Sequence, residues 1–157
     1  MKNETITTDQ APAAIGPYSQ AVRAGDFIYT AGQGGLDPRT NQMVAGGVQA
    51  QAEQTMKNLQ AVLEAAGVGF EDVVKTNIYL HFIKDFAVVN EVYASYFSGS
   101  PPARSTVAVS ALPLKALVEI EMIAYVPQVE EPQGDLQQPP VEKKHPKKKG
   151  KKAKKNK

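Results

Sequence analysis

SPPARSTVAVSALPLKALVEIEMIAYV, residues 100–126, is the stretch that decides the fold. Its second half alternates with a period of two, as a half-buried strand requires. One face carries the apolar residues Val118, Ile120, Met122, Ala124 and Val126. The other face carries Glu119, Glu121, Ile123 and Tyr125. We therefore expect a strand with two carboxylates on one side.

The first half of the stretch brings an arginine toward this strand. Two prolines favour an extended backbone just before Arg104, which stands at the start of a second short strand, 105–110. If the loop 111–116 closes a hairpin between the two strands, Arg104 and Thr106 fall on the same face as Glu119. This register predicts an arginine and a glutamate close together.

The rest of the chain predicts strands that alternate with two helices. Further strands are expected at residues 19–23, 27–31 and 73–82, and helices at 48–66 and 86–97. Residues up to Ile15 are expected to be a loosely held arm, and 36–47 a loop. This order predicts an α+β fold in which two helices pack on one face of a mixed sheet.

Apolar spacing predicts which side chains are buried. The first helix has a stripe of Ala52, Met56, Leu59, Leu63 and Ala66, and the strand 73–82 has Val74, Thr76, Ile78, Leu80 and Phe82 on one side. The second helix, which Asp85 could cap, has a stripe of Phe86, Val89, Tyr93 and Tyr96. Ile123 and Tyr125 would then lie on the sheet face without helices, which indicates an interface with another chain.

Charge divides the 157 residues into two parts. Residues 1–127 hold 8 Lys and Arg against 12 Asp and Glu, whereas 128–157 hold 10 Lys against 4 acids. We expect one folded domain over 1–127. The segment 128–157 is rich in proline, glutamine and lysine and has few apolar residues, so we expect it to be a disordered tail.

Cysteine is absent from the sequence. This absence excludes disulfides, thiolate nucleophiles and cysteine-ligated metals, and it fits a reducing compartment. The N-terminus, MKNETITTDQ, lacks the apolar segment of a signal peptide, and no apolar run is long enough to cross a membrane. We therefore expect a cytoplasmic protein without membrane insertion.

Several spaced motifs resemble the RidA (YjgF) family of reactive-intermediate imine and enamine deaminases. PPARSTV and VEIEMIA, within 100–126, carry the resemblance most clearly. Further matching segments are GPYSQAV (16–22), FIYTAGQ (27–33), QTMKNLQAVLEAAG (54–67) and VNEVYASYF (89–97). The resemblance covers residues of about 10 to 127, and the last thirty residues lie outside it.

The resemblance implies a chorismate-mutase-like fold that assembles as a homotrimer, with active sites in the clefts between subunits. The implied reaction is the hydrolysis of 2-imino or enamine acids, such as 2-aminoacrylate and 2-iminobutanoate, to 2-oxo acids and ammonia. Such substrates are already activated, so neither a metal nor a covalent nucleophile is needed. We expect no cofactor.

Arg104 is our candidate anchor for the substrate carboxylate, because a guanidinium matches a carboxylate with two parallel hydrogen bonds. The resemblance implies that Glu119, rather than Glu121, holds and polarises water. It also implies that Tyr18, Ala31, Gly32 and Asn90 line the pocket. Thr106 stands where cysteine is common in the family, and its hydroxyl can also donate and accept hydrogen bonds. By pattern alone, Tyr18 would be a half-buried strand aromatic and Asn90 a solvated helix residue.

Two other functions remain open on the sequence. The lysines between Lys143 and Lys157 could solubilise the chain or make nonspecific contacts with RNA or DNA, and ribonuclease activity is also attributed to family members. No paired acid and base for RNA cleavage is evident, and His81 reads as a strand-end side chain. The Arg104 cleft could also sense small carboxylates without turnover.

Overall fold

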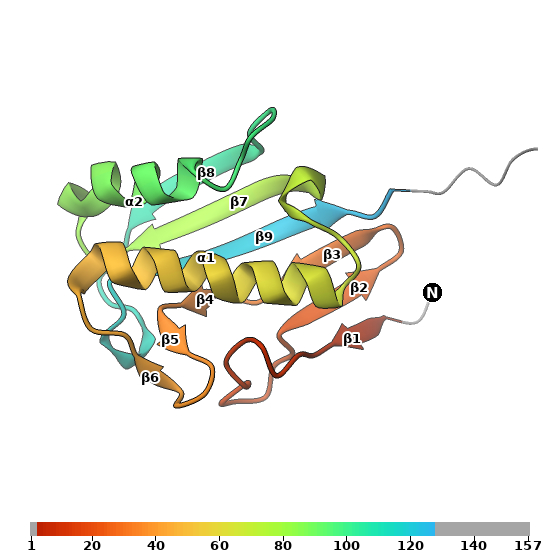
Figure 1. The fold of residues 1–157 in the computed structure, drawn as a ribbon, viewed down its shortest axis with the longest axis horizontal. Helices are drawn as coiled ribbons and strands as arrows, with labels where there is room; N and C mark the ends of the chain where they lie inside the picture. Colours follow the sequence, from red (N-terminus) through yellow and green to blue (C-terminus); the bar gives the residue numbers. More distant parts are fainter. Residues whose placement is uncertain (1–2, 128–157) are drawn as a thin grey trace, which may run out of the picture.

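A seven-stranded mixed sheet organises residues 3–127, which are the residues that the computed structural model describes (Figure 1). The main path of the sheet runs β1 (Glu4–Ile6), β2 (Ala21–Ala24), β3 (Phe27–Thr30), β9 (Val118–Tyr125), β7 (Val73–Leu80) and β8 (Ala103–Ala108), and β4 (Gln33–Gly34) also pairs with β9. The short strands β5 (Leu36–Asp37) and β6 (Gln42–Met43) form a separate pair. The tail expected at 128–157 lies outside the described residues.

Two helices cover one face of this sheet, α1 (Gly47–Ala65) and α2 (Phe86–Ala94) (Figure 1). The predicted α+β architecture with a mixed sheet is thereby confirmed. Short 3-10 turns occupy Phe70–Asp72, Ile83–Asp85 and Pro113–Lys115. The hairpin of β2 and β3 is also present, and its turn contains Gly25 at φ 63°, a conformation that glycine adopts without strain.

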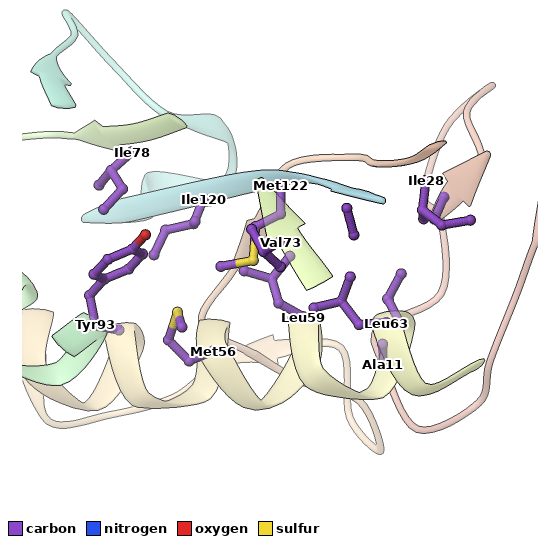
Figure 2. Packing of buried hydrophobic residues seen from close by; sticks show 14 of the residues in the cluster. Ala11, Ile28, Met56, Leu59, Leu63, Val73, Ile78, Tyr93, Ile120 and Met122 are labelled. Carbon is purple, nitrogen blue, oxygen red and sulfur yellow. The ribbon is translucent and has the colours of Figure 1, made fainter. Parts of the chain in front are cut away.

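The core lies between α1 and the central strands (Figure 2). Met56, Leu59 and Leu63 of α1 are fully buried and face the sheet. Ile120 and Met122 of β9 face them from the sheet, which confirms the alternation read from the sequence. Each such side chain contributes roughly 1.5–3 kcal/mol when it leaves water. This packing fixes which face of β9 is left for Glu119 and Glu121.

The predicted hairpin between residues 105–110 and the last strand is wrong. β7 lies between β8 and β9, parallel to the first and antiparallel to the second. The chain reaches β8 through α2, as a β-helix-β crossover requires, and then passes the end of β7. There the amide of Val109 donates to the Leu80 carbonyl, and the amide of His81 donates to the Leu117 carbonyl.

Three predicted buried side chains and one predicted helix cap also differ from the structure. Val74 is exposed because the register of β7 against β9 shifts between Val73 and Lys75, a bulge that turns its side chain outward. Phe82 lies beyond the end of β7 and is exposed, and so is Phe86 at the start of α2. Asp85 precedes α2 but makes no side-chain cap hydrogen bond.

The N-terminal arm is more ordered than its composition predicts. β1 pairs with β2, and Ile6 and Ala11 are buried in the core. The buried Gln20 side chain holds the segment through hydrogen bonds, since its Nε2 donates to the carbonyls of Thr8 and Pro12 at 3.0 and 2.8 Å. These bonds satisfy backbone groups that a polar segment otherwise exposes to water.

Candidate functional site

One part of the candidate site is built around Glu119 of β9. This residue alternates with the buried Val118 and Ile120, so its side chain lies on the sheet face that the helices leave open. Its half-buried carboxylate borders a hollow of about 360 Å³. The other residues that line this hollow are Ile15, Tyr18, Ala31, Gly32, Gly34, Leu36, Met43, Pro113, Leu114 and Ala116.

Gly32 is placed against Glu119 by the short strand β4, in which Gly34 is the register partner of Glu119. The buried amide of Asn58 on α1 holds this segment, because its Nδ2 donates to the carbonyls of Gly34 and Leu36 at 3.0 and 2.9 Å. A Cβ on Gly32 would lie 2.8 Å from Cδ of Glu119. A side chain at residue 32 would therefore displace the carboxylate end of Glu119.

Electrostatics distinguish the two glutamates of β9. Glu121 accepts hydrogen bonds from Nδ2 of Asn77 at 2.8 Å and from the hydroxyl of Tyr79 at 3.0 Å. Glu119 accepts none from residues 3–127. Burial raises the pKa of the Glu119 carboxyl, and the negative charge of Glu121 raises it further. Of the two glutamates, Glu119 is thus the one without a hydrogen-bond partner among residues 3–127 and with a raised pKa.

A second part of the site is built around Arg104 of β8. Its register partner on β7 is the fully buried Thr76, so the Arg104 side chain lies on the helix-covered face. Its Nη2 donates to Oδ1 of Asn90 on α2 at 2.9 Å. The guanidinium carbon also lies 4.9 Å from the ring centroid of Tyr93 and 5.7 Å from that of Phe86. A hollow of about 490 Å³ adjoins Arg104, Asn90 and Tyr93.

Arg104 has no acidic partner within residues 3–127, where the ion pair is that of Arg39 with Asp37. All the groups that hold its guanidinium are neutral, so its positive charge is not compensated. Two residues further along β8, the hydroxyl oxygen of Thr106 is buried and has no hydrogen-bond partner in the described part of the chain. An uncompensated guanidinium and a buried hydroxyl without a partner both favour binding of an anion.

The structure brings the candidate residues together in two groups rather than one. Tyr18, Ala31, Gly32 and Glu119 line one hollow. Arg104 and Asn90 line another, with Thr106 beside them on β8. The predicted placement of Arg104 on the face of Glu119 is wrong, because β7 separates their strands and the two side chains leave the sheet on opposite sides.

The sequence interpretation missed three residues near these groups. Tyr93 and Phe86 contact Arg104 through their rings, although the helical spacing 86, 90, 93 already placed both on the face of Asn90. Leu114 is 54% exposed beside the Glu119 hollow and adopts a positive φ of 54°. No sequence signal marks that backbone conformation.

Three further observations concern metal, histidine and membrane sites in the described part of the chain. No cluster of three or more His, Asp or Glu residues that could hold a metal ion is present between residues 3 and 127. His81 packs its ring edge against Phe82, with centroids 4.1 Å apart. In the same range, neither helix is long and apolar enough to cross a bilayer.

Comparisons with known proteins show the family to which the chain belongs. A family model described as endoribonuclease L-PSP matches residues 8–126. The chain is 54% identical over 121 residues to mouse 2-iminobutanoate/2-iminopropanoate deaminase, a match that covers 77% of this chain and 90% of the mouse protein.

Solved structures show the same family likeness. RidA from an Antarctic Psychrobacter is 50% identical, with a TM-score of 0.76 over 78% of this chain and 99% of that chain. E. coli TdcF, solved with bound serine, is 39% identical, with a TM-score of 0.75 over 78% of this chain and 98% of that chain. The chain belongs to the endoribonuclease L-PSP family, the family of proteins named RidA and YjgF.

Proposed function

We propose that this protein hydrolyses reactive 2-imino acids and their enamine tautomers to 2-oxo acids and ammonia, without a cofactor. Substrates of this class are 2-aminoacrylate and 2-iminobutanoate. The observation that carries the proposal is that one hollow holds a cationic group and the other holds an acidic group. Arg104 offers an uncompensated cation, and Glu119 offers a carboxyl group with a raised pKa. The deaminase name of the mouse relative supports the same reaction class.

Arg104 would bind the carboxylate of the substrate. One Nη2 hydrogen bond is occupied by Asn90, and the guanidinium keeps further N–H groups for a forked contact. Serine, the molecule named with E. coli TdcF, also carries a carboxylate. A charge-assisted pair of this kind contributes roughly 1.5–3 kcal/mol, which is enough to orient a small anion.

Glu119 would deliver water to the imine carbon. The substrate reacts as the iminium tautomer, and ionised Glu119 accepts a proton as the water oxygen bonds to C2, which gives a tetrahedral carbinolamine with a neutral amino group. The protonated carboxyl then gives this proton to the nitrogen. As the C–N bond breaks, the carbinolamine hydroxyl gives its proton to Glu119 and becomes the carbonyl of the 2-oxo acid, and ammonia takes that proton from the carboxyl and leaves as ammonium. Because burial raises the pKa of Glu119, both protonation states are closer in energy than for an exposed glutamate.

A complete site would require two copies of the chain. Arg104 and Glu119 face opposite sides of one sheet, so they can meet only across a subunit boundary. The open face also exposes the aromatic rings of Phe27, Tyr29 and Tyr125, which pack against each other and favour contact with a partner. We therefore propose active sites between subunits, and we take the number of subunits, three, from the family resemblance.

The experiment that tests the reaction is ammonia release from 2-aminoacrylate generated by a second enzyme. Addition of the wild-type protein should accelerate release well above the spontaneous rate. Arg104→Ala should return the rate to that of the uncatalysed reaction. Equal rates with and without the wild-type protein would reject the proposed activity. Binding of 2-oxobutanoate without any acceleration would instead favour a carboxylate sensor.

A second candidate function is nucleic-acid contact or RNA cleavage, which the family's description as endoribonuclease L-PSP favours. The lysines between Lys143 and Lys157 would supply the cationic charge, through counterion release that weakens with salt. A chain ending at Pro127 should then lose RNA binding at low salt. RNA degradation that survives Arg104→Ala and disappears with the tail would support this function over deamination.

The cellular role follows from the chemistry of the substrate. Enamines such as 2-aminoacrylate arise at pyridoxal-phosphate enzymes and can attack them, so their rapid hydrolysis would protect those enzymes. We place this role in the cytoplasm, as the composition of the chain suggests.

A further inference from the structure

Arg104 rests on one face of α2 that contains no acid. Phe86, Asn90 and Tyr93 follow the helical spacing i, i+4 and i+7, so all three point toward β8. Two of them present aromatic rings to the guanidinium, at 5.7 and 4.9 Å from Cζ, and the third accepts a hydrogen bond at 2.9 Å. We call these three residues the α2 cradle.

Tyr93 is the most firmly held member of the cradle. The residue is 4% exposed, and its hydroxyl donates to Oγ1 of Thr76 on β7 at 3.1 Å. Burial raises the pKa of the Tyr93 hydroxyl, so this donor keeps its proton. Thr76 is also the register partner of Arg104. The ring is therefore fixed to the same part of the sheet that carries the arginine.

A neutral cradle has a different effect on Arg104 from an ion pair. Aromatic faces and an amide oxygen orient a guanidinium and lower the cost of removing it from water, yet they leave its net charge intact. A carboxylate in the same place would orient the arginine but would also compete with an incoming anion. The cradle can thus fix the arginine without weakening its attraction for a ligand.

We propose that Tyr93 is a positioning residue that, with Phe86 and Asn90, holds the Arg104 fork ready for a carboxylate and sets the affinity of the site for anionic substrates. The inference rests on the proposed function only for the identity of the substrate. The cradle itself acts at the binding step, so binding can be tested without turnover.

The test measures the affinity of the assembled protein for 2-oxobutanoate by calorimetry, with the neutral 2-oxobutanamide as a second ligand. Tyr93→Leu and the exposed Phe86→Leu should each weaken 2-oxobutanoate binding about 3- to 30-fold, the range expected for loss of a cation–π contact. Binding of the amide should change less. Tyr93→Phe keeps the ring and should stay within about 2-fold of wild type.

Two further variants separate the effect of the α2 cradle on Arg104 from the effect of a general change in packing. Phe82→Leu changes an exposed aromatic that contacts Lys84 rather than Arg104, and it should leave the affinity unchanged. Asn90→Asp should lower it more than 10-fold, because the new carboxylate pairs with Arg104. In turnover assays, Phe86→Leu should raise KM with little change in kcat.

Three results would overturn the inference. One is a 2-oxobutanoate affinity that stays unchanged both in Phe86→Leu and in a Tyr93→Leu protein that is shown to be folded. Another is an equal loss in Tyr93→Phe and Tyr93→Leu, which would assign the effect to the hydroxyl group. The third is a wild-type protein that binds no 2-oxobutanoate. By contrast, normal binding and normal cradle effects without imine hydrolysis would reject the proposed reaction and leave the cradle supported.

Discussion

Arg104 and Glu119 stand on opposite faces of one sheet, with β7 between their strands. Two strand spacings, about 10 Å, separate the two backbones even before the side chains diverge. The arginine points under α2, and the glutamate points toward Gly32 on the open face. A small substrate therefore cannot contact both side chains within one chain.

Replacing Arg104 with lysine tests the forked contact. Arg104→Lys keeps the charge but loses the planar pair of donors, so kcat/KM should fall about 10- to 150-fold, the equivalent of 1.5–3 kcal/mol. The oligomer should remain intact. Arg39→Lys is the matched control, because Arg39 is exposed and pairs only with Asp37. Near-normal turnover by Arg104→Lys would remove the arginine from its assigned role.

Glu119→Gln tests the proton transfer. The amide keeps the shape of the carboxyl group but cannot accept the proton from water, so hydrolysis should slow about 10²- to 10⁴-fold. Binding of 2-oxobutanoate should persist, because Arg104 is untouched. Calorimetry and ammonia release on the same sample check both statements. A Glu119→Gln protein as fast as wild type would mean that another group handles the proton.

The pH dependence of kcat/KM tests the electrostatics of the site. If ionised Glu119 is the active form, the rate falls as pH decreases through its raised pKa. Glu121→Gln removes the neighbouring negative charge, which lowers the pKa of Glu119 and moves this acidic limb to lower pH. Glu64→Gln, an exposed change on α1, should leave the limb in place. A shift in the opposite direction would be inconsistent with the assignment.

Gly32→Ala tests the close approach of β4 to Glu119. The new Cβ would lie 2.8 Å from Cδ of Glu119, so the carboxylate must move. Because the carboxylate is the flexible end of a half-buried side chain, we expect little change in the free energy of unfolding but a large loss of activity. Gly34→Ala is the control for stability, because its Cβ would meet only ordinary contacts at 3.8 Å. Urea titration and ammonia release compare the two variants, and normal turnover by Gly32→Ala would show that the position of the Glu119 carboxylate does not matter.

Local pattern predicted much of this fold from the sequence. Alternation in residues 118–125 assigned every side chain of β9 to its correct face, and the stripe from Ala52 to Leu63 on α1 is buried as expected. Both signals depend on periods of the backbone itself, 2.0 and 3.6 residues. They hold without knowledge of the neighbouring elements.

Local patterns could not predict which strands pair with one another in the sheet. Alternation placed Arg104 and Thr106 on a common face but could not say which one, because that depends on β7 pairing with both β8 and β9. The bulge that exposes Val74 and the hydrogen bond from Arg104 to Asn90 arise from long-range packing. The family resemblance pointed to Asn90 and Gly32, for which the pattern alone gave no role.

The most direct test of the account is activity in mixed oligomers of two inactive variants, Arg104→Ala and Glu119→Gln, unfolded together, refolded together and assayed for ammonia release. If each site takes Arg104 from one copy and Glu119 from a neighbour, about a quarter of the sites in an equal mixture are fully wild type and regain activity. Each variant refolded alone should stay inactive. If the mixture also stays inactive while it forms mixed oligomers, the site is not shared between subunits and the central claim fails.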